Sequence, residues 1–130
     1  MKMLLAGMVA VFSLAIFLGA DQAGEKDKKA EPKFKIKEVM AKAHGEEGLL
    51  EKVTEGTATA KEKKLLVEMY VALHENRPPM GDPAKWAKVT QAMVDGAKAV
   101  DAGKDDKGVS LAKVVNCKVC HAEFKAPKKK

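Results

Sequence analysis

Apolar residues recur every three or four positions in several segments of this chain, and no segment alternates apolar and polar residues with a period of two. The first pattern is typical of amphipathic helices and the second of strands. The apolar positions predict helices at about residues 34–44, 59–76, 82–103 and 109–125, with one or two further turns in residues 46–56. Because short connections between amphipathic helices favour antiparallel neighbours, we expect an all-α fold, an antiparallel four-helix bundle.

Signals for the ends of helices support these boundaries. Thr59 and Glu62 have the spacing of a capping box, so the second helix should begin there. Pro78 cannot continue that helix, since proline lacks the backbone N–H that a helix interior requires. Asp82 can cap the third helix, with Pro83 at its first position.

The N-terminus has the features of a secretory signal peptide in residues 1–20. Lys2 precedes an uncharged apolar run that ends in small residues just before Asp21. We therefore expect a periplasmic or otherwise exported protein. Because the run approaches the roughly 20 apolar residues of a membrane span, an uncleaved anchor is the alternative.

The rest of the chain divides by composition. Residues 21–33 are polar and Lys-rich, which predicts a disordered basic lead-in, and residues 126–130 form a basic tail. Residues 34–125 are the length of a single domain. The net charge of the chain is +6, and the basic residues gather at its two ends. This distribution favours electrostatic steering of the protein towards redox partners with acidic docking surfaces. Aromatic residues make up only 5%, so we expect no nucleic-acid binding.

The chain contains two cysteines, both in the motif C-x-x-C-H formed by Cys117, Cys120 and His121. This motif is typical of covalent attachment of a c-type haem. Residues three and four apart share one face of a helix, so both thiols can form thioethers to one porphyrin, and the imidazole can bind the iron. The alternative is a non-haem helical protein with a disulfide between the cysteines. A zinc site needs about four ligands, but the only further histidines are His44 and His74 and there is no further cysteine, so the sequence does not favour a zinc site.

With its signal peptide, helical pattern and single C-x-x-C-H close to the C-terminus, the chain resembles the class II c-type cytochromes, the cytochrome c prime group. The resemblance covers residues 34–125. It implies one covalent haem c on the last helix and, in low-spin members, a Met on the first helix as the sixth iron ligand, a position that Met40 matches. Members that lack this Met leave the iron five-coordinate and bind NO or CO. Relatives often pair through their first two helices, so a homodimer is an option.

Two other residues compete with Met40 for the iron. His44 lies one helical turn beyond Met40, and Met80 lies in a proline-flanked loop from which it can be carried towards the iron. We expect Met69 and Met93 to be core residues, because a Met on an apolar stripe usually fills the core.

Four further residues have expected surroundings. Tyr70 is expected to send its hydroxyl to a haem propionate or to water. We expect Trp86, Tyr70 and Phe124 to pack against each other or against the haem edge, and His74 to lie on the surface.

The most consistent interpretation is an exported monohaem c-type cytochrome that transfers single electrons between redox proteins. No residues form a hydrolytic triad or a pair of carboxylates in a plausible pocket, so we expect no enzyme. The alternatives are a five-coordinate haem protein that binds NO or CO, and the disulfide-containing protein without haem.

Overall fold

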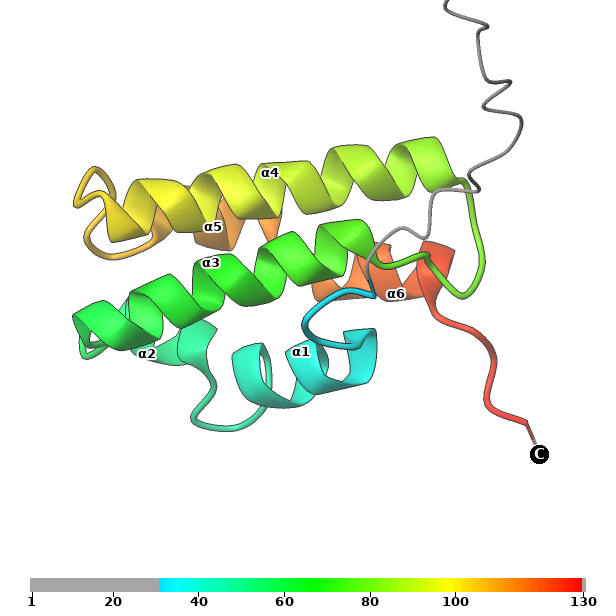
Figure 1. The fold of residues 1–130 in the computed structure, drawn as a ribbon, viewed down its shortest axis with the longest axis horizontal. Coiled ribbons are helices and arrows are strands. Elements are labelled where there is room, and N and C mark those ends of the chain that lie inside the picture. The colour runs from blue at the N-terminus through cyan, green and yellow to red at the C-terminus, as the bar shows by residue number, and fades with distance from the viewer. Residues whose placement is uncertain (1–30, 130) are drawn as a thin grey trace, which may run out of the picture.

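The computed structural model describes residues 31–129, and this part of the chain is all-helical, as predicted (Figure 1). Its six helices are α1 (Ile36–Ala43), α2 (Leu49–Glu55), α3 (Ala60–Glu75), α4 (Pro83–Asp101), α5 (Val109–Val114) and α6 (Cys117–Phe124). The signal peptide expected in residues 1–20 lies outside the described residues, as does most of the lead-in. None of the described helices is long and apolar enough to cross a membrane.

The two longest helices, α3 and α4, form an antiparallel pair that packs along its whole length (Figure 1). The predicted capping box begins α3, where the backbone N–H of Glu62 donates to Thr59 Oγ1 and the backbone N–H of Thr59 donates to Glu62 Oε2. The carboxylate of Asp82 accepts from the N–H of Ala84, which caps α4 as predicted. Local sequence signals therefore set the start of both helices.

The other helices bury their apolar faces against this pair. Helices α1 and α2 contact α3, and α5 contacts α4 and α2. The hydrophobic core comprises Val39, Ala43, Leu49, Val53, Leu66, Met69, Tyr70, Leu73, Trp86, Met93, Val94, Ala97, Val100, Leu111 and Phe124. Met69 and Met93 are core residues, as predicted. A Cβ on Gly96 would lie 2.9 Å from Leu111 Cδ1, so the missing side chain lets α5 approach α4 closely.

The prediction of one helix over residues 109–125 was wrong, because the chain breaks between α5 and α6. Val115 and Asn116 are extended, and the Asn116 side chain accepts from the backbone N–H of Val119 at 3.1 Å as the N-cap of a new helix. The physical reason is local. Val114 and Val115 are β-branched, and asparagine is among the strongest N-caps because its side chain replaces a backbone hydrogen-bond acceptor.

Candidate functional site: the C-x-x-C-H helix and its pocket

Helix α6 carries the C-x-x-C-H motif and lies opposite α1. The Asn116 cap starts the helix at Cys117, so Cys117, Cys120 and His121 are all helical and lie on one face. The break before Cys117 thus sets the direction in which these three side chains point. Helix α6 makes fewer backbone contacts with the other helices than they make among themselves.

Contacts near its C-terminal end hold α6 in place. The rings of Trp86 and Phe124 meet edge to face with centroids 5.2 Å apart, as predicted for these two rings, whereas the ring of Tyr70 meets that of His44. Lys85 Nζ lies 2.9 Å from a carboxylate oxygen of Glu123. Gly81 has φ of +88°, and a Cβ there would lie 2.8 Å from the Glu123 carbonyl oxygen, so the loop before α4 rests directly on the end of α6.

An apolar cavity of about 420 Å³ lies between α1 and α6. Its lining residues are Ile36, Lys37, Met40, Pro79, Trp86, Cys120, His121, Phe124 and Lys125. Cofactor pockets are mostly apolar and enclose roughly 300–1,000 Å³, so this cavity has the size and lining of such a site. A smaller cavity on the other side of Met40 and His121 is lined by both of them, by His44, and by Cys117 and Cys120.

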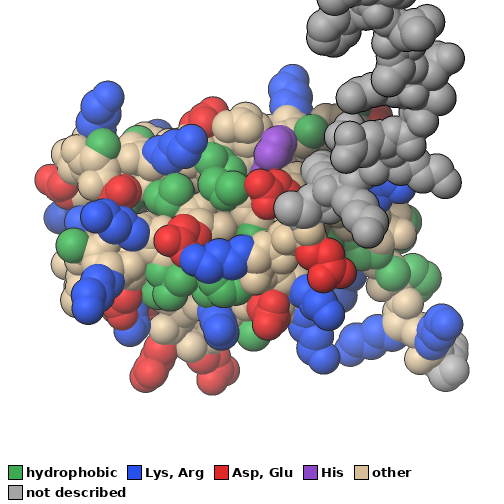
Figure 2. All heavy atoms as spheres, viewed as in Figure 1, with side chains coloured by type: hydrophobic (Ala, Val, Ile, Leu, Met, Phe, Trp, Pro, Cys, Tyr) green, Lys and Arg blue, Asp and Glu red, His purple; other side chains and the backbone are tan. Residues whose placement is uncertain are grey.

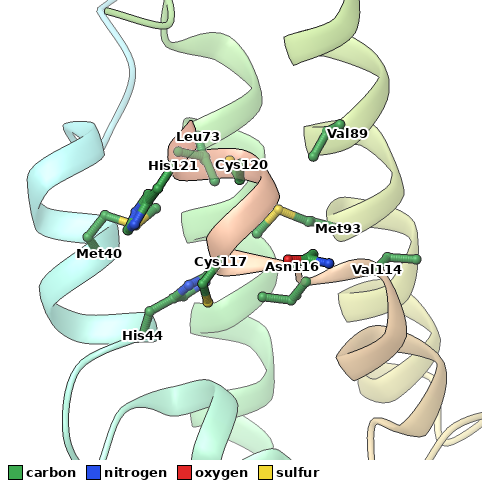
Figure 3. Close-up of a pocket in the computed structure, with 11 residues that line it drawn as sticks. Met40, His44, Leu73, Val89, Met93, Val114, Asn116, Cys117, Cys120 and His121 are labelled. Carbon is green, nitrogen blue, oxygen red and sulfur yellow. The ribbon is translucent and has the colours of Figure 1, made fainter. Parts of the chain in front are cut away.

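Met40 and His121 line both cavities and point toward one another from α1 and α6 (Figure 3). The structure thus brings together four of the predicted site residues, Met40, Cys117, Cys120 and His121, although at least 77 positions separate Met40 from the other three. His44 lines the smaller cavity, one turn along α1 from Met40.

Met80 does not line either cavity. Its side chain is 43% exposed in the loop between α3 and α4. Of the three residues predicted to compete for the sixth iron position, Met40 and His44 therefore share a cavity with His121.

His44 forms a hydrogen bond that sequence reasoning missed. Its Nε2 lies 3.0 Å from the hydroxyl oxygen of Tyr70, and the two rings meet at 80° with centroids 5.6 Å apart. The hydroxyl that we predicted to meet a propionate or water therefore has a protein partner, His44. Burial, and then the nearby His121, lowers the pKa of His44, while burial raises the pKa of Tyr70. Burial thus favours the neutral form of both groups.

His74 was expected on the surface but is half-buried. Its Nδ1 lies 2.8 Å from Thr90 Oγ1, which in turn donates to the carbonyl of Trp86 at 2.7 Å. The Trp86 Nε1–H donates to the carbonyl of Asn76 at 2.8 Å. These bonds join the end of α3 to the start of α4, and Trp86 also lines the larger cavity. No local signal predicts them, because the partners lie 10 and 16 residues apart.

Both cysteines are free thiols in the structure, Cys117 exposed and Cys120 half-buried. Burial, followed by the charges of Cys117 and Glu123, raises the pKa of the Cys120 thiol. Among the described residues, no group of three or more His, Cys, Asp or Glu side chains converges to hold a bare metal ion. A porphyrin iron, in contrast, takes only one or two axial ligands from the protein.

Comparisons of the chain with family models, curated proteins and solved structures found no match.

Proposed function

We propose that the protein is an exported electron carrier that holds one covalent haem c and passes single electrons between redox proteins. The observation that carries the proposal is the position of the C-x-x-C-H face. Met40, Cys120 and His121 line an apolar cavity of about 420 Å³, and Met40 and His121 point toward one another from α1 and α6. A face with two thiols and an imidazole, set against a thioether across an apolar space, is the ligand chemistry of a c-type haem site.

A haem in this cavity also accounts for the sparse contacts of α6. The cavity separates α1 from α6, and a porphyrin would fill it with apolar surface. In this arrangement α1, α3, α4 and the broken α5–α6 segment pack around the group as the four arms of an antiparallel bundle.

Each residue of the site then has a defined role. The Cys117 and Cys120 thiols would each add to one vinyl group of the porphyrin and form two thioethers, which would keep the group on the protein. His121 would hold the iron through an imidazole nitrogen, and Met40 would hold it through its thioether sulfur. Ile36, Trp86 and Phe124 would give the group an apolar wall to pack against. The group would supply one-electron chemistry between ferric and ferrous iron, and these residues would set its potential through their ligand types and the burial that they provide.

The partner surface follows from the charges near α6. Lys118, Val119 and Lys125 are exposed on this helix and just after it. On the face shown in Figure 2, basic and acidic side chains are interspersed over the helices, and lysines gather towards the C-terminal end. An acidic partner docking beside α6 would meet an exposed valine flanked by lysines, close to the proposed haem. Such charge complementarity raises the rate of encounter more than the affinity.

The proposal is tested by the absorption spectrum of the full chain exported from a host with a haem-attachment system. Ferric and dithionite-reduced spectra are recorded with and without carbon monoxide. We expect sharp reduced bands, a weak far-red ferric band from a Met sulfur ligand, and no response to the gas. The Cys117→Ala, Cys120→Ala double variant should lose covalent haem after acid–acetone extraction.

Other results would contradict the proposal in distinct ways. A reduced band that shifts with carbon monoxide would favour the five-coordinate gas-binding alternative. Absence of haem from a competent host would reject both haem proposals and leave the disulfide alternative, which a free-thiol assay would then test.

A further inference from the structure

Tyr70 lies in the middle of α3, where its side chain is fully buried. Its hydroxyl contacts the Nε2 of His44, the residue that caps the C-terminal end of α1. No buried side-chain nitrogen or oxygen among the described residues lacks a hydrogen-bond partner, and for the Tyr70 hydroxyl that partner is His44. The contact therefore satisfies a polar group that has no access to water.

The same contact occupies the atom that His44 would need to bind iron. His44 lines the cavity of His121 together with Met40, so both α1 residues are within the site. An imidazole binds a metal through a nitrogen lone pair. Nε2 is the less hindered nitrogen, because Nδ1 is bonded to Cγ, the ring carbon that is attached to Cβ. If Nε2 accepts a hydrogen bond from Tyr70, its lone pair is already used, and if Nε2 donates, it carries a proton. In both tautomers of His44, Nε2 is therefore unavailable to bind iron.

Releasing His44 from Tyr70 has a cost. The buried hydroxyl would lose its hydrogen-bond partner, and this cost lowers the equilibrium constant for release of His44 by about 5- to 150-fold. No such cost applies to Met40, since a thioether is at most a weak hydrogen-bond acceptor.

We propose that Tyr70 selects the sixth ligand of the site by holding the Nε2 of His44, so that Met40 binds the iron in place of His44. This inference rests on the proposed haem function. Tyr70 is a positioning residue: it acts through His44 and does not itself contact the iron. The choice of ligand matters, because a Met and His pair gives a higher reduction potential than two imidazoles.

The test is Tyr70→Phe, which removes the hydroxyl and keeps the ring that meets His44 edge-on. We expect the haem-loaded variant to lose the far-red ferric band, keep its sharp reduced bands and show a lower reduction potential. In the double variant Tyr70→Phe, His44→Ala the far-red band should return, because no second imidazole competes. The single variant His44→Ala should keep the band. Far-ultraviolet circular dichroism checks that each variant is folded.

Several results would overturn the inference. A Tyr70→Phe protein that keeps the far-red band and the wild-type potential would show that the hydroxyl does not select the ligand. Loss of the wild-type ligation in His44→Ala alone would show that His44 already binds the iron, and this result does not depend on whether Tyr70→Phe folds. A wild-type iron that binds carbon monoxide would also overturn it. Absence of covalent haem from the wild type is a different failure, that of the proposed function itself.

Discussion

The rings of Trp86 and Phe124 meet edge to face at 75°, with centroids 5.2 Å apart. This pair joins the first turn of α4 to the last residue of α6, three positions after His121. Edge-to-face pairs add stability beyond the apolar area that they bury, so this contact anchors an otherwise sparsely packed helix. The direction in which His121 points therefore depends on two rings outside the motif.

Replacing Phe124 with alanine should loosen that anchor. Truncation of a buried phenylalanine costs about 3–5 kcal/mol, and Phe124 is almost fully buried. Guanidinium unfolding of the haem-loaded protein would measure the loss. Val119→Ala is the matched control on the same helix: Val119 is 59% exposed, so its truncation should change the free energy of unfolding by less than about 0.5 kcal/mol. Equal effects of the two changes would contradict the described packing of α6.

Alanine substitutions at two glycines distinguish the cost of backbone strain from the cost of a clash with α6. Gly56 and Gly81 both have positive φ, +75° and +88°, so an alanine at either position costs roughly 1–2 kcal/mol. A Cβ on Gly56 meets nothing within 4 Å, whereas one on Gly81 would lie 2.8 Å from Phe124 Cδ1. We expect Gly81→Ala to lower the melting temperature clearly more than Gly56→Ala. A similar effect from both would mean that the loop does not rest on α6.

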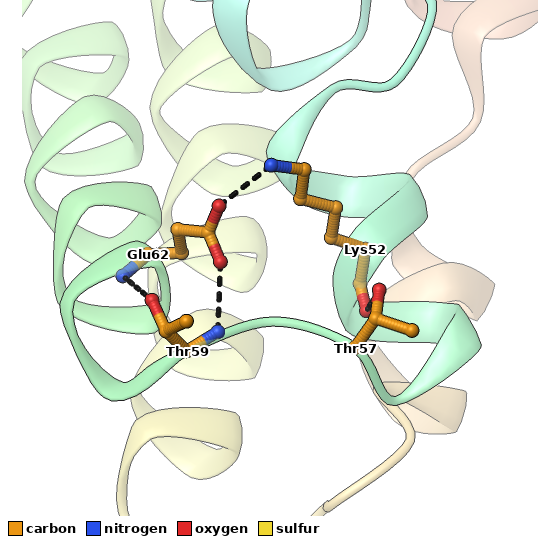
Figure 4. Close-up of polar contacts among 4 residues, drawn as sticks. All are labelled: Lys52, Thr57, Thr59 and Glu62. Atoms are coloured by element: carbon orange, nitrogen blue, oxygen red, sulfur yellow. Dashed lines mark hydrogen bonds and ion pairs between the residues drawn. The ribbon is translucent and has the colours of Figure 1, made fainter.

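Acid should weaken the junction between α2 and α3 through Glu62 (Figure 4). The hydrogen bond from Lys52 Nζ at 2.6 Å, followed by those from Thr59, lowers the pKa of Glu62 to about 2. Because folding lowers this pKa, the stabilisation is present above the pH at which the unfolded carboxyl titrates and is lost as the pH falls towards about 2.

A carbon-detected NMR titration of the Glu62 carboxyl measures this effect directly. Lys52→Gln should move the midpoint upward, because the largest cause of the shift is removed. A wild-type midpoint in the ordinary range of a glutamate would disprove the predicted interaction. The lysine and the carboxylate are solvent-accessible, so salt should also weaken the effect.

Alanine substitutions of Met40 and Met69 should differ in their effects on the haem spectrum and on stability. Met40→Ala should abolish the far-red ferric band, because it removes the proposed sulfur ligand at a half-buried position. Met69→Ala should keep the band and destabilise the protein by about 2–5 kcal/mol, since Met69 is fully buried in the core. Spectra and unfolding curves of both variants distinguish ligation from packing, and a far-red band that survives in Met40→Ala would reject Met40 as the ligand.

Loss of the haem should leave the chain loosely folded. Without the thioethers, the Cys117→Ala, Cys120→Ala variant lacks the group that we propose fills the cavity between α1 and α6, and a ligand that binds only the folded state stabilises it. We expect less helicity by circular dichroism and a lower melting temperature. Helicity and melting equal to those of the wild type would count against this prediction.

The local features of the fold could be predicted from the sequence. The capping box at Thr59 and the cap at Asp82 were found from residue types at short separations, and the structure contains both. The break at Asn116 was missed because the apolar spacing continues through it, although Asn after two valines is itself a signal for a new helix start. The Tyr70–His44 and His74–Thr90 contacts have no sequence signal, because their partners come from different elements.

By itself the sequence determined where α3 and α4 begin, which helix faces are apolar, and that two thiols and an imidazole share one short segment, because each of these depends on residues within about a turn of one another. Only the tertiary structure decided that Met40 and His121 line the same cavity, that Met80 stays outside it, and that His44 is held by Tyr70. The reason is that such contacts depend on how helices pack, and packing sums many weak apolar contacts over the whole chain.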